Sequence, residues 1–255
     1  FVSMGDLNND GYQDIFCLGG GGGTDKLFWN NQDGTFSAAT DWWVDDMGMP
    51  VTLTGHTGGG VAMADFDDDG WLDFYVTSHG PANATIMGQH RLFHNNGDGT
   101  FTNVAAAAGV DFTSMLLPDG TTPTFGDYDL DGDLDMFVCG WRVRPVLPLS
   151  NRLFRNEGNG TFTDVTAQAG VLSGRIAGFT PNFCDMDGDI YPEILLASDL
   201  CLSRYLINDG DGTFTEFTNG SNTGKGCSEM GAAVGDVNGD GHFDWYVSQV
   251  CSATN

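Results

Sequence analysis

The chain has 255 residues and carries 35 acidic residues against 9 Lys and Arg, which gives a formal net charge of −26 at pH 7. This charge argues against nucleic acid and anionic membrane surfaces as partners. It does not indicate disorder, because 40% of the residues are hydrophobic, 12% are aromatic and the acids are spread along the whole chain. No apolar run approaches the roughly 20 residues that a transmembrane helix needs, and the start at Phe1 without a methionine indicates an internal or processed segment.

Acidic loops recur along the chain with the pattern Asp-x-Asp/Asn-x-Asp-Gly-x-x-Asp. The five copies begin at Asp6, Asp65, Asp127, Asp185 and Asp236. Successive first residues are 59, 62, 58 and 51 positions apart, which is the length of one four-stranded propeller blade with its loops. In the fourth copy Ile190 replaces the glycine and is expected to resist the turn, and Glu193 replaces the final Asp.

Short apolar runs flank each loop, such as residues 61–64 before the second loop and 74–76 after it. Runs of this length, rich in β-branched and aromatic residues, predict strands buried on both faces, and we name them A and B. The residue before each loop is small, which suits an innermost strand close to a central axis. These residues are Gly5, Ala64, Gly126, Cys184 and Gly235.

A hairpin is predicted after strand B in four repeats, over residues 26–36, 91–101, 152–162 and 204–214. Each has Asp-Gly or Asn-Gly at its centre. These pairs indicate a turn, because their residues accept the positive φ that tight hairpins require. We name its strands C and D. A basic residue opens strand C in each copy, and we expect it to form an ion pair within its own blade.

These elements predict an all-β chain, a β-propeller of four-stranded blades with Ca²⁺ loops between strands A and B. The repeats span approximately residues 1–60, 61–121, 122–180 and 181–231, with a partial repeat at 232–255. Residues 1–255 are thus expected to form a single propeller segment of four and a half blades. Further chain or another molecule would then close the ring.

The loops carry the oxygen donors that Ca²⁺ prefers, of which it takes about 6–8. Positions 1, 3 and 5 supply side-chain oxygens, position 7 a backbone carbonyl, and position 9 a carboxylate at the start of strand B. The predicted ligands are Asp6, Asn8, Asp10, Tyr12, Asp14, Asp65, Asp67, Asp69, Trp71, Asp73, Asp127, Asp129, Asp131, Asp133, Asp135, Asp185, Asp187, Asp189, Tyr191, Glu193, Asp236, Asn238, Asp240, His242 and Asp244.

Other metal-binding classes fit the pattern less well. An EF-hand needs a Glu at position 12 and flanking helices, and Mg²⁺ prefers octahedral sites that retain water. The six cysteines contain no CxxC pair that would suggest zinc. Positions 1, 3, 5 and 9 of the five loops hold 18 of the 35 carboxylates, and five Ca²⁺ ions would change the net charge from −26 to −16. We expect about five Ca²⁺ sites. We also expect removal of Ca²⁺ by a chelator to loosen the fold, because the carboxylates within each loop then repel one another.

The loops, followed by Leu-Phe-x-Asn-Asn-Gly-Asp-Gly-Thr-Phe-Thr-x-Val and Ala-Gly-Val, resemble FG-GAP/VCBS repeats, the blades of integrin-α-like propellers. The nearest resemblance is to the bacterial cartilage-acidic-protein-like family, and it covers almost the whole chain. The resemblance implies a secreted or cell-surface propeller of bacterial origin with Ca²⁺ in its A-to-B loops. Members of such families serve adhesion, carbohydrate binding or scaffolding, and some are attached to enzymes.

The B-to-C and D-to-A loops differ between repeats, and variable loops on a repeated scaffold are the usual place for recognition. Their aromatic and Arg residues could stack on sugars or contact a protein, or could instead pack between blades. The candidates are Trp42, Trp43, Trp141, Arg142 and Arg144. Cys201, Cys227 and Cys251 fall in the same loops, and two of them could form a disulfide in a secreted protein.

The sequence therefore favours an extracellular Ca²⁺-stabilised binding or adhesion module for a glycan or a protein. One alternative is a structural subunit that assembles with copies of itself in a surface layer, filament or matrix. Another is a propeller appended to a polysaccharide-active enzyme. The chain itself is not expected to be an enzyme and no catalytic residue is predicted, because it contains neither a GxSxG nor an HExxH motif.

Overall fold

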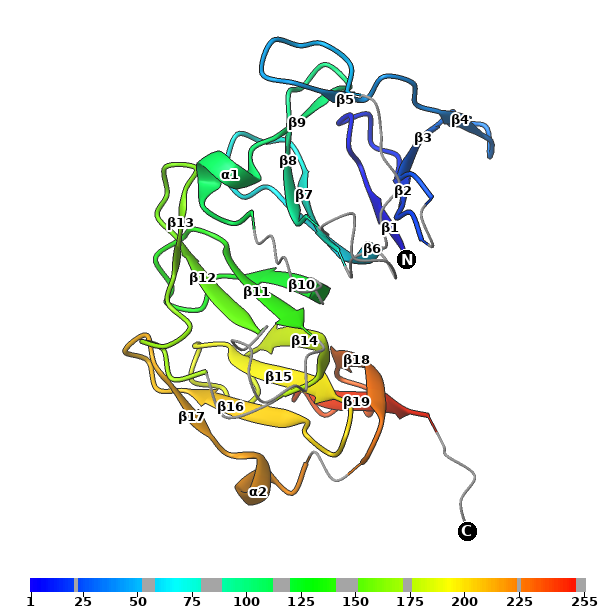
Figure 1. Ribbon diagram of the computed structural model, residues 1–255. Helices are drawn as coiled ribbons and strands as arrows, with labels where there is room; N and C mark the ends of the chain where they lie inside the picture. Colours follow the sequence, from blue (N-terminus) through cyan, green and yellow to red (C-terminus); the bar gives the residue numbers. More distant parts are fainter. Residues whose placement is uncertain are drawn as a thin grey trace. The chain divides into compact units, whose positions relative to one another are not determined.

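A computed structural model describes residues 1–20, 23–51, 58–78, 89–111, 120–140, 151–171, 176–223 and 226–250 (Figure 1). Strands dominate the secondary structure of this part of the chain, and its two helices, α1 (Ala105–Ala108) and α2 (Thr218–Ser221), make one turn each. Within the described residues, no helix has the length and apolarity to cross a membrane. The predicted all-β class is confirmed.

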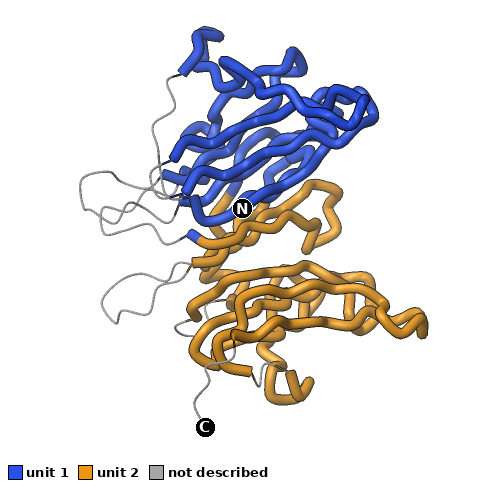
Figure 2. Tube along the Cα trace, turned by 90° about the vertical axis from the view of Figure 1, so that its right-hand side faces the viewer, with its two compact units in different colours: residues 1–120, 156–162 blue, residues 121–155, 163–255 orange. Residues whose placement is uncertain are grey.

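The chain folds into two compact units (Figure 2). The first contains residues 1–120 and 156–162, and the second contains residues 121–155 and 163–255. The boundary runs through the third repeat. The arrangement of all repeats in one continuous propeller segment stays a prediction.

Two sheets lie in the first unit. One is antiparallel with the order β1 (Val2–Gly5), β2 (Asp14–Cys17), β3 (Lys26–Asn30) and β4 (Phe36–Ala38). The other has the order β6 (Gly58–Ala64), β7 (Asp73–Ser78), β8 (Arg91–Asn95) and β9 (Phe101–Asn103), with β5 (Trp43–Val44) added parallel to β9. The four-stranded blade is thus confirmed, whereas β5 is an addition that the repeat pattern did not predict.

The remaining strands repeat this order. A third sheet contains β10 (Gly120–Gly126), β11 (Asp135–Gly140), β12 (Arg152–Asn156) and β13 (Phe162–Asp164). A fourth contains β14 (Gly178–Cys184), β15 (Glu193–Ser198), β16 (Arg204–Asn208) and β17 (Phe214–Glu216). The described part of the fifth repeat is a two-stranded pair, β18 (Glu229–Gly235) and β19 (Asp244–Gln249).

The register of strands A and B fixes where each acidic loop closes. The small residue that ends strand A faces the acid that opens strand B, as in the pairs Gly5 with Asp14 and Ala64 with Asp73. The neighbouring blade leaves little room at two of these residues, because a Cβ on Gly5 would lie 2.9 Å from the Sδ of Met63 and one on Gly126 would lie 2.7 Å from the ring of Phe183. Crowding by the next sheet therefore accounts for the small residue at Gly5 and Gly126, whereas a Cβ on Gly235 would meet nothing within 4 Å.

Large apolar side chains fill the space between sheets within each unit. In the first unit Phe16, Phe74 and Phe93 are completely buried, and the rings of Phe16 and Phe74 lie 4.6 Å apart. In the second unit, Phe137 and Ile194 belong to one buried cluster. Burial of this apolar area is the main force that stacks one blade on the next.

The basic residues that open strand C behave in two ways. Arg152 pairs with Asp164 and Arg204 with Glu216, in each case between strands C and D of one blade, as predicted. In contrast, Arg91 pairs with Asp25 of the preceding repeat at 3.7 Å and lies over the ring of Trp43. The within-blade prediction is wrong for Arg91, because an uncharged asparagine, Asn103, stands where the other two blades have their acid.

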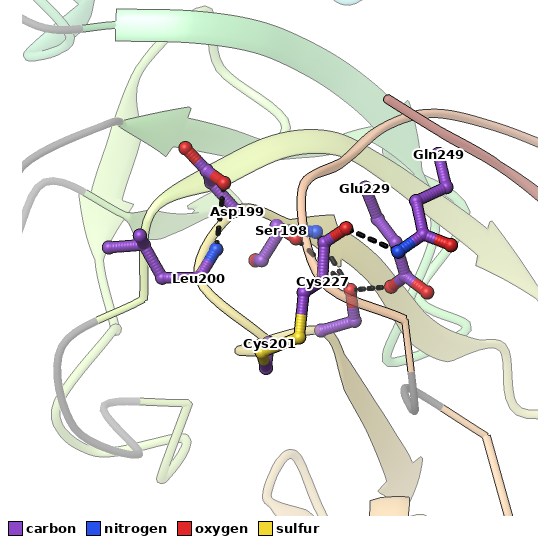
Figure 3. The surroundings of a disulfide bond; sticks show 8 residues. Ser198, Asp199, Leu200, Cys201, Cys227, Glu229 and Gln249 are labelled. Carbon is purple, nitrogen blue, oxygen red and sulfur yellow. Dashed lines mark hydrogen bonds between the residues drawn. A yellow bond between two sulfur atoms is a disulfide. The ribbon is translucent and has the colours of Figure 1, made fainter. Parts of the chain in front are cut away.

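A disulfide links Cys201, in the loop after β15, to Cys227, just before β18 (Figure 3). It confirms that two of the three predicted loop cysteines pair. The side chain of Gln249 donates a 2.6 Å hydrogen bond to the carbonyl of Cys227, and Ser203 hydrogen-bonds to Glu229 beside it. The cross-link closes a separation of 26 residues, for which the chain-entropy estimate is a stabilisation of about 3–4 kcal/mol.

Candidate metal centres

The first acid of each loop holds the turn closed through backbone N–H groups. In the first loop, the carboxylate of Asp6 accepts the N–H of Asp10 at 3.0 Å and that of Gly11 at 2.8 Å. The same pair of bonds, 2.9–3.2 Å long, recurs in the second, third and fifth loops. At position 5, the acid accepts the N–H of position 7 in all five loops. The carboxylates are therefore oriented by the backbone without help from a metal.

The last acid is fully buried in the first four loops and half-buried in the fifth. Asp14, Asp73, Asp135 and Glu193 have no exposed surface. In the second loop, Asp73 accepts the N–H of Phe66 with one carboxylate oxygen and the N–H of Asn95 with the other, at 3.2 and 2.8 Å. These bonds tie the loop to strand C, so that the position-9 acid belongs to both the sheet and the candidate metal site.

Three acids converge in each of the second, third and fourth loops. In each set, one ligand atom per residue lies within 4.8 Å of the others. The sets are Asp65, Asp67 and Asp73; Asp127, Asp129 and Asp135; and Asp185, Asp187 and Glu193. In the first and fifth loops the third position is Asn8 or Asn238, and its amide donates to the position-5 acid. The structure thus brings together the predicted side chains at positions 1, 3 and 9 in three of the loops.

Burial raises the pKa of the acids that face into these loops. The pKa of Glu193 is raised to about 7, chiefly by burial and further by the neighbouring carboxylates. Burial is also the main cause that raises the pKa of Asp73 and Asp129. By contrast, the N–H of His242 lowers the pKa of the fully exposed Asp240. The buried acids therefore need either a proton or a cation.

Two carboxylate oxygens in these loops have no hydrogen-bond partner although they are buried. They are Oδ1 of Asp129 and Oε1 of Glu193. An unpaired buried oxygen of this kind is costly, and a bound cation would satisfy it. The donor set, the convergence and these oxygens fit a metal ion.

The fourth loop keeps the turn despite its isoleucine. Ile190 has a φ of +81°, close to the +89° of Gly70 at the same position of the second loop. Its N–H still donates to Asp185, at 3.0 Å. The expected resistance appears only as strain, about 1–2 kcal/mol for a non-glycine residue in the left-handed region.

The second loop has an additional neighbour that the sequence analysis missed. Nδ1 of His94, on strand C, lies 3.2 Å from Asp67 and 3.5 Å from Asp73. The hydrogen bond to Asp73 is the main cause that raises the pKa of His94. The corresponding residues of the first, third and fourth blades are Trp29, Arg155 and Ile207. This position, directly before the asparagine that ends strand C, therefore differs in every blade. Aligning the four C strands by sequence would have shown the difference.

The candidate ligand-binding residues lie in different surroundings from those expected of a recognition face. Trp42 is only 3% exposed and contacts the rings of Phe16 and Phe93. Trp43 packs edge-on against Phe93 and beneath Arg91. Both tryptophans therefore contribute to the core of the first unit. Trp141, Arg142 and Arg144 lie outside the described residues.

The sequence matches the profile of the FG-GAP-like repeat over residues 6–76, 82–138 and 185–247. The chain belongs to the FG-GAP-like repeat family. The matched regions include all five acidic loops. The predicted resemblance is confirmed, and the blades described above are FG-GAP-like repeats.

Curated relatives extend this result. The FG-GAP-like chain is 35% identical over 159 residues to cartilage acidic protein 1 of Xenopus tropicalis and, to the same degree, to that of Homo sapiens. The aligned part is 60% of this chain and 21% of each relative, so the chain spans about a fifth of the length of the relatives it matches. These relatives come from vertebrates and give no support to the predicted bacterial origin.

A solved structure agrees with the fold. Rhamnogalacturonan lyase YesX superimposes with a TM-score of 0.51 at 16% identity, over 97% of this chain and 44% of the lyase. At this identity the match supports the fold alone. Cartilage acidic protein 1 is not named for a catalytic activity, and the lyase match assigns none to the FG-GAP-like chain.

Proposed function

We propose that this chain is an extracellular, Ca²⁺-stabilised binding or adhesion module for a glycan or a protein. The observation that carries the proposal is the acidic loop itself, built five times with the same backbone hydrogen bonds around side-chain oxygens. A repeated loop of this kind is a fixed part of the scaffold, and the loops that differ between blades are left for recognition.

Calcium suits the loops because nearly all of the donors are oxygens. In the second loop, Asp65, Asp67, Asp69 and Asp73 would supply carboxylates, and the backbone of Trp71 a carbonyl. Such a set is typical of Ca²⁺, a hard cation that accepts flexible geometry. The bound ion would supply the positive charge that these carboxylates lack, and each centre would thereby stiffen the connection between strands A and B.

The proposed location rests on two findings. The Cys201–Cys227 disulfide is typical of an oxidising compartment. The relatives are named for cartilage, a tissue that consists largely of extracellular matrix. The disulfide and the names of the relatives both favour a secreted or cell-surface protein.

The charge of the chain narrows the class of partner. A net charge of −26 would repel polyanionic glycans, and even five bound Ca²⁺ ions would leave it negative. Neutral glycans and basic protein surfaces are therefore the favoured partners. The same repulsion disfavours an acidic polysaccharide as substrate or ligand.

The proposal is tested by applying the Ca²⁺-loaded protein to an array of neutral and anionic glycans and of immobilised basic proteins. We expect retention on neutral glycans or basic proteins that EGTA abolishes and added Ca²⁺ restores. Ca²⁺-dependent growth of the sedimentation coefficient without any retention would instead support a self-assembling subunit. Depolymerisation of a polysaccharide would support an enzyme-associated role, and either outcome would overturn the proposal.

A further inference from the structure

Strand C ends in an asparagine that reaches out of its own sheet. Asn95, Asn156 and Asn208 are at most 2% exposed. The side-chain amide of each donates a hydrogen bond to a residue 80–90 positions earlier in the sequence, with lengths of 2.8, 2.7 and 2.8 Å. The three acceptors are equivalent, because each is the carbonyl of the second residue of the acidic loop in the preceding repeat: Leu7, Phe66 and Tyr128. Each donor and acceptor lie within one compact unit.

The accepting residue is also held by its own loop. The N–H of Leu7 donates to Asp14 at 3.0 Å, and the N–H of Tyr128 donates to Asp135 at 3.0 Å. The second residue lies between the first two side-chain ligands of the loop. Its backbone is therefore fixed on one side by the final acid of that loop and on the other by the asparagine of the next blade.

The asparagine is at the same time part of the loop in its own blade. The backbone N–H of Asn95 donates to Asp73 at 2.8 Å, and its side-chain amide also donates to Leu72 at 3.1 Å. Its side-chain oxygen accepts the N–H of Gly97 at the hairpin turn. Two donors and one acceptor are used at once, which an aspartate or an aliphatic side chain cannot reproduce.

These contacts form a continuous path from one loop to the next. Starting at Asp14, it passes through Leu7 to Asn95 and from there to Asp73, the buried acid of the second loop. From Asp73 the same path continues through Phe66 to Asn156. The hydrogen bonds therefore connect each repeat to the one before it in the sequence.

We propose that the asparagine at the end of strand C couples neighbouring acidic loops, so that filling one loop with metal raises the affinity of the next. The inference rests on the proposed role of the loops as Ca²⁺ sites. A bound ion fixes the positions of the first, third and final acids, and this holds the carbonyl of the second residue in place for the asparagine. The asparagine in turn holds the final acid of its own loop.

The test is a double-mutant cycle with Tb³⁺, a hard cation that replaces Ca²⁺ and emits light when a nearby tryptophan is excited. Trp71, at position 7 of the second loop, is the reporter. Because Trp71 also lines a pocket with Asn8 of the first loop, the site-2 signal is the emission that both Trp71→Phe and Asp73→Asn remove. Asp6→Asn weakens the first loop. In the parent chain we expect it to lower Tb³⁺ affinity at the second loop about 3- to 10-fold, the effect of a typical buried hydrogen bond. In Asn95→Ala this effect should shrink to what the direct hydrogen bond from Asn9 to Gly70 transmits between the two loops.

Asn96→Ala is the matched control, because Asn96 is the next residue of the same hairpin and its side chain donates to Thr100 and Thr102 of that hairpin. We expect this variant to retain the effect of Asp6→Asn. Both variants keep the backbone bond to Asp73, and Asn95→Ser, which adds a polar hydroxyl, replaces Asn95→Ala if circular dichroism shows that the alanine variant does not fold. Should both variants fail to fold, the same cycle with Asp127→Asn and Asn208→Ala, read through Tyr191, carries the test.

The possible outcomes separate the two proposals. An equal effect of Asp6→Asn in the parent, Asn95→Ala and Asn96→Ala chains, or no effect in any of them, would overturn the coupling while leaving the metal sites intact. Absence of Tb³⁺ binding in the parent chain would overturn the proposed function and the coupling together.

Discussion

In saturating Ca²⁺, Asp73→Asn should lower the melting temperature by about 5–11 °C. The expectation follows from the loss of one site, worth about 2.7 kcal/mol when the ion is at 100 times its dissociation constant, and from a shift of about 2–4 °C per kcal/mol for domains of this size. An asparagine also has only one acceptor oxygen, whereas Asp73 accepts N–H groups from Phe66 and Asn95 with two. Thermal melting followed by circular dichroism measures the effect.

The matched control is Asp68→Asn in the same loop. Asp68 is exposed at position 4 and has a φ of +61°, a conformation that asparagine tolerates well. We expect it to change the melting temperature little, with or without Ca²⁺. In EGTA the difference between Asp73→Asn and the parent should shrink or reverse, because the buried negative charge is then uncompensated. Equal losses from Asp73→Asn in Ca²⁺ and in EGTA would contradict a metal role for Asp73.

The stability of the chelated protein should fall as the pH rises from about 4.5 to about 7. Burial raises the pKa of Glu193 to about 7 from an ordinary value of 4.5. Below pH 4.5 this carboxyl is protonated in both the folded and the unfolded chain. Between the two values the unfolded chain releases the proton while the folded chain keeps it, so each pH unit favours unfolding by at most about 1.4 kcal/mol.

Other groups act in the same direction. Burial raises the pKa of Asp14, Asp73 and Asp129, and the hydrogen bond with Asp73 raises that of His94, whose stabilising contribution is also lost as the pH rises. With saturating Ca²⁺ the trend should reverse, because the ion takes the place of the protons. Glu193→Gln should flatten the slope in EGTA, since glutamine is neutral at every pH. Melting temperatures in EGTA that rise over this interval would contradict the account of the buried acids.

The sequence was sufficient for the repeat and for the local part of each loop. The alternation of acids in Asp65–Asp73 sets the turn through bonds within nine residues, and such short-range geometry is determined by the residues themselves. The Asp-Gly hairpins follow for the same reason. Strand order and loop placement could then be predicted from the repeat, its apolar runs and its hairpin turns.

Features that depend on the neighbouring blade could not be predicted in this way. Trp42 is an aromatic residue in a variable loop, which made it a candidate for recognition. The packing of β5 beside β9 buries it instead. Arg91 has the uncharged Asn103 at the strand D position where two other blades have an acid, and it pairs with Asp25 instead. Asn95 looked like one more polar residue at a strand end, although it bonds to Leu7, which lies 88 positions away. Contacts with residues distant in the sequence determine the role of each of these side chains, and local sequence patterns do not predict such contacts.

Isothermal titration of the metal-free protein with CaCl₂ is the most direct test of the central claim that the acidic loops are calcium sites. The account predicts binding of about five ions per chain, with a rise in melting temperature in the same samples. Binding of no Ca²⁺, together with melting that is unchanged by EGTA, would contradict it.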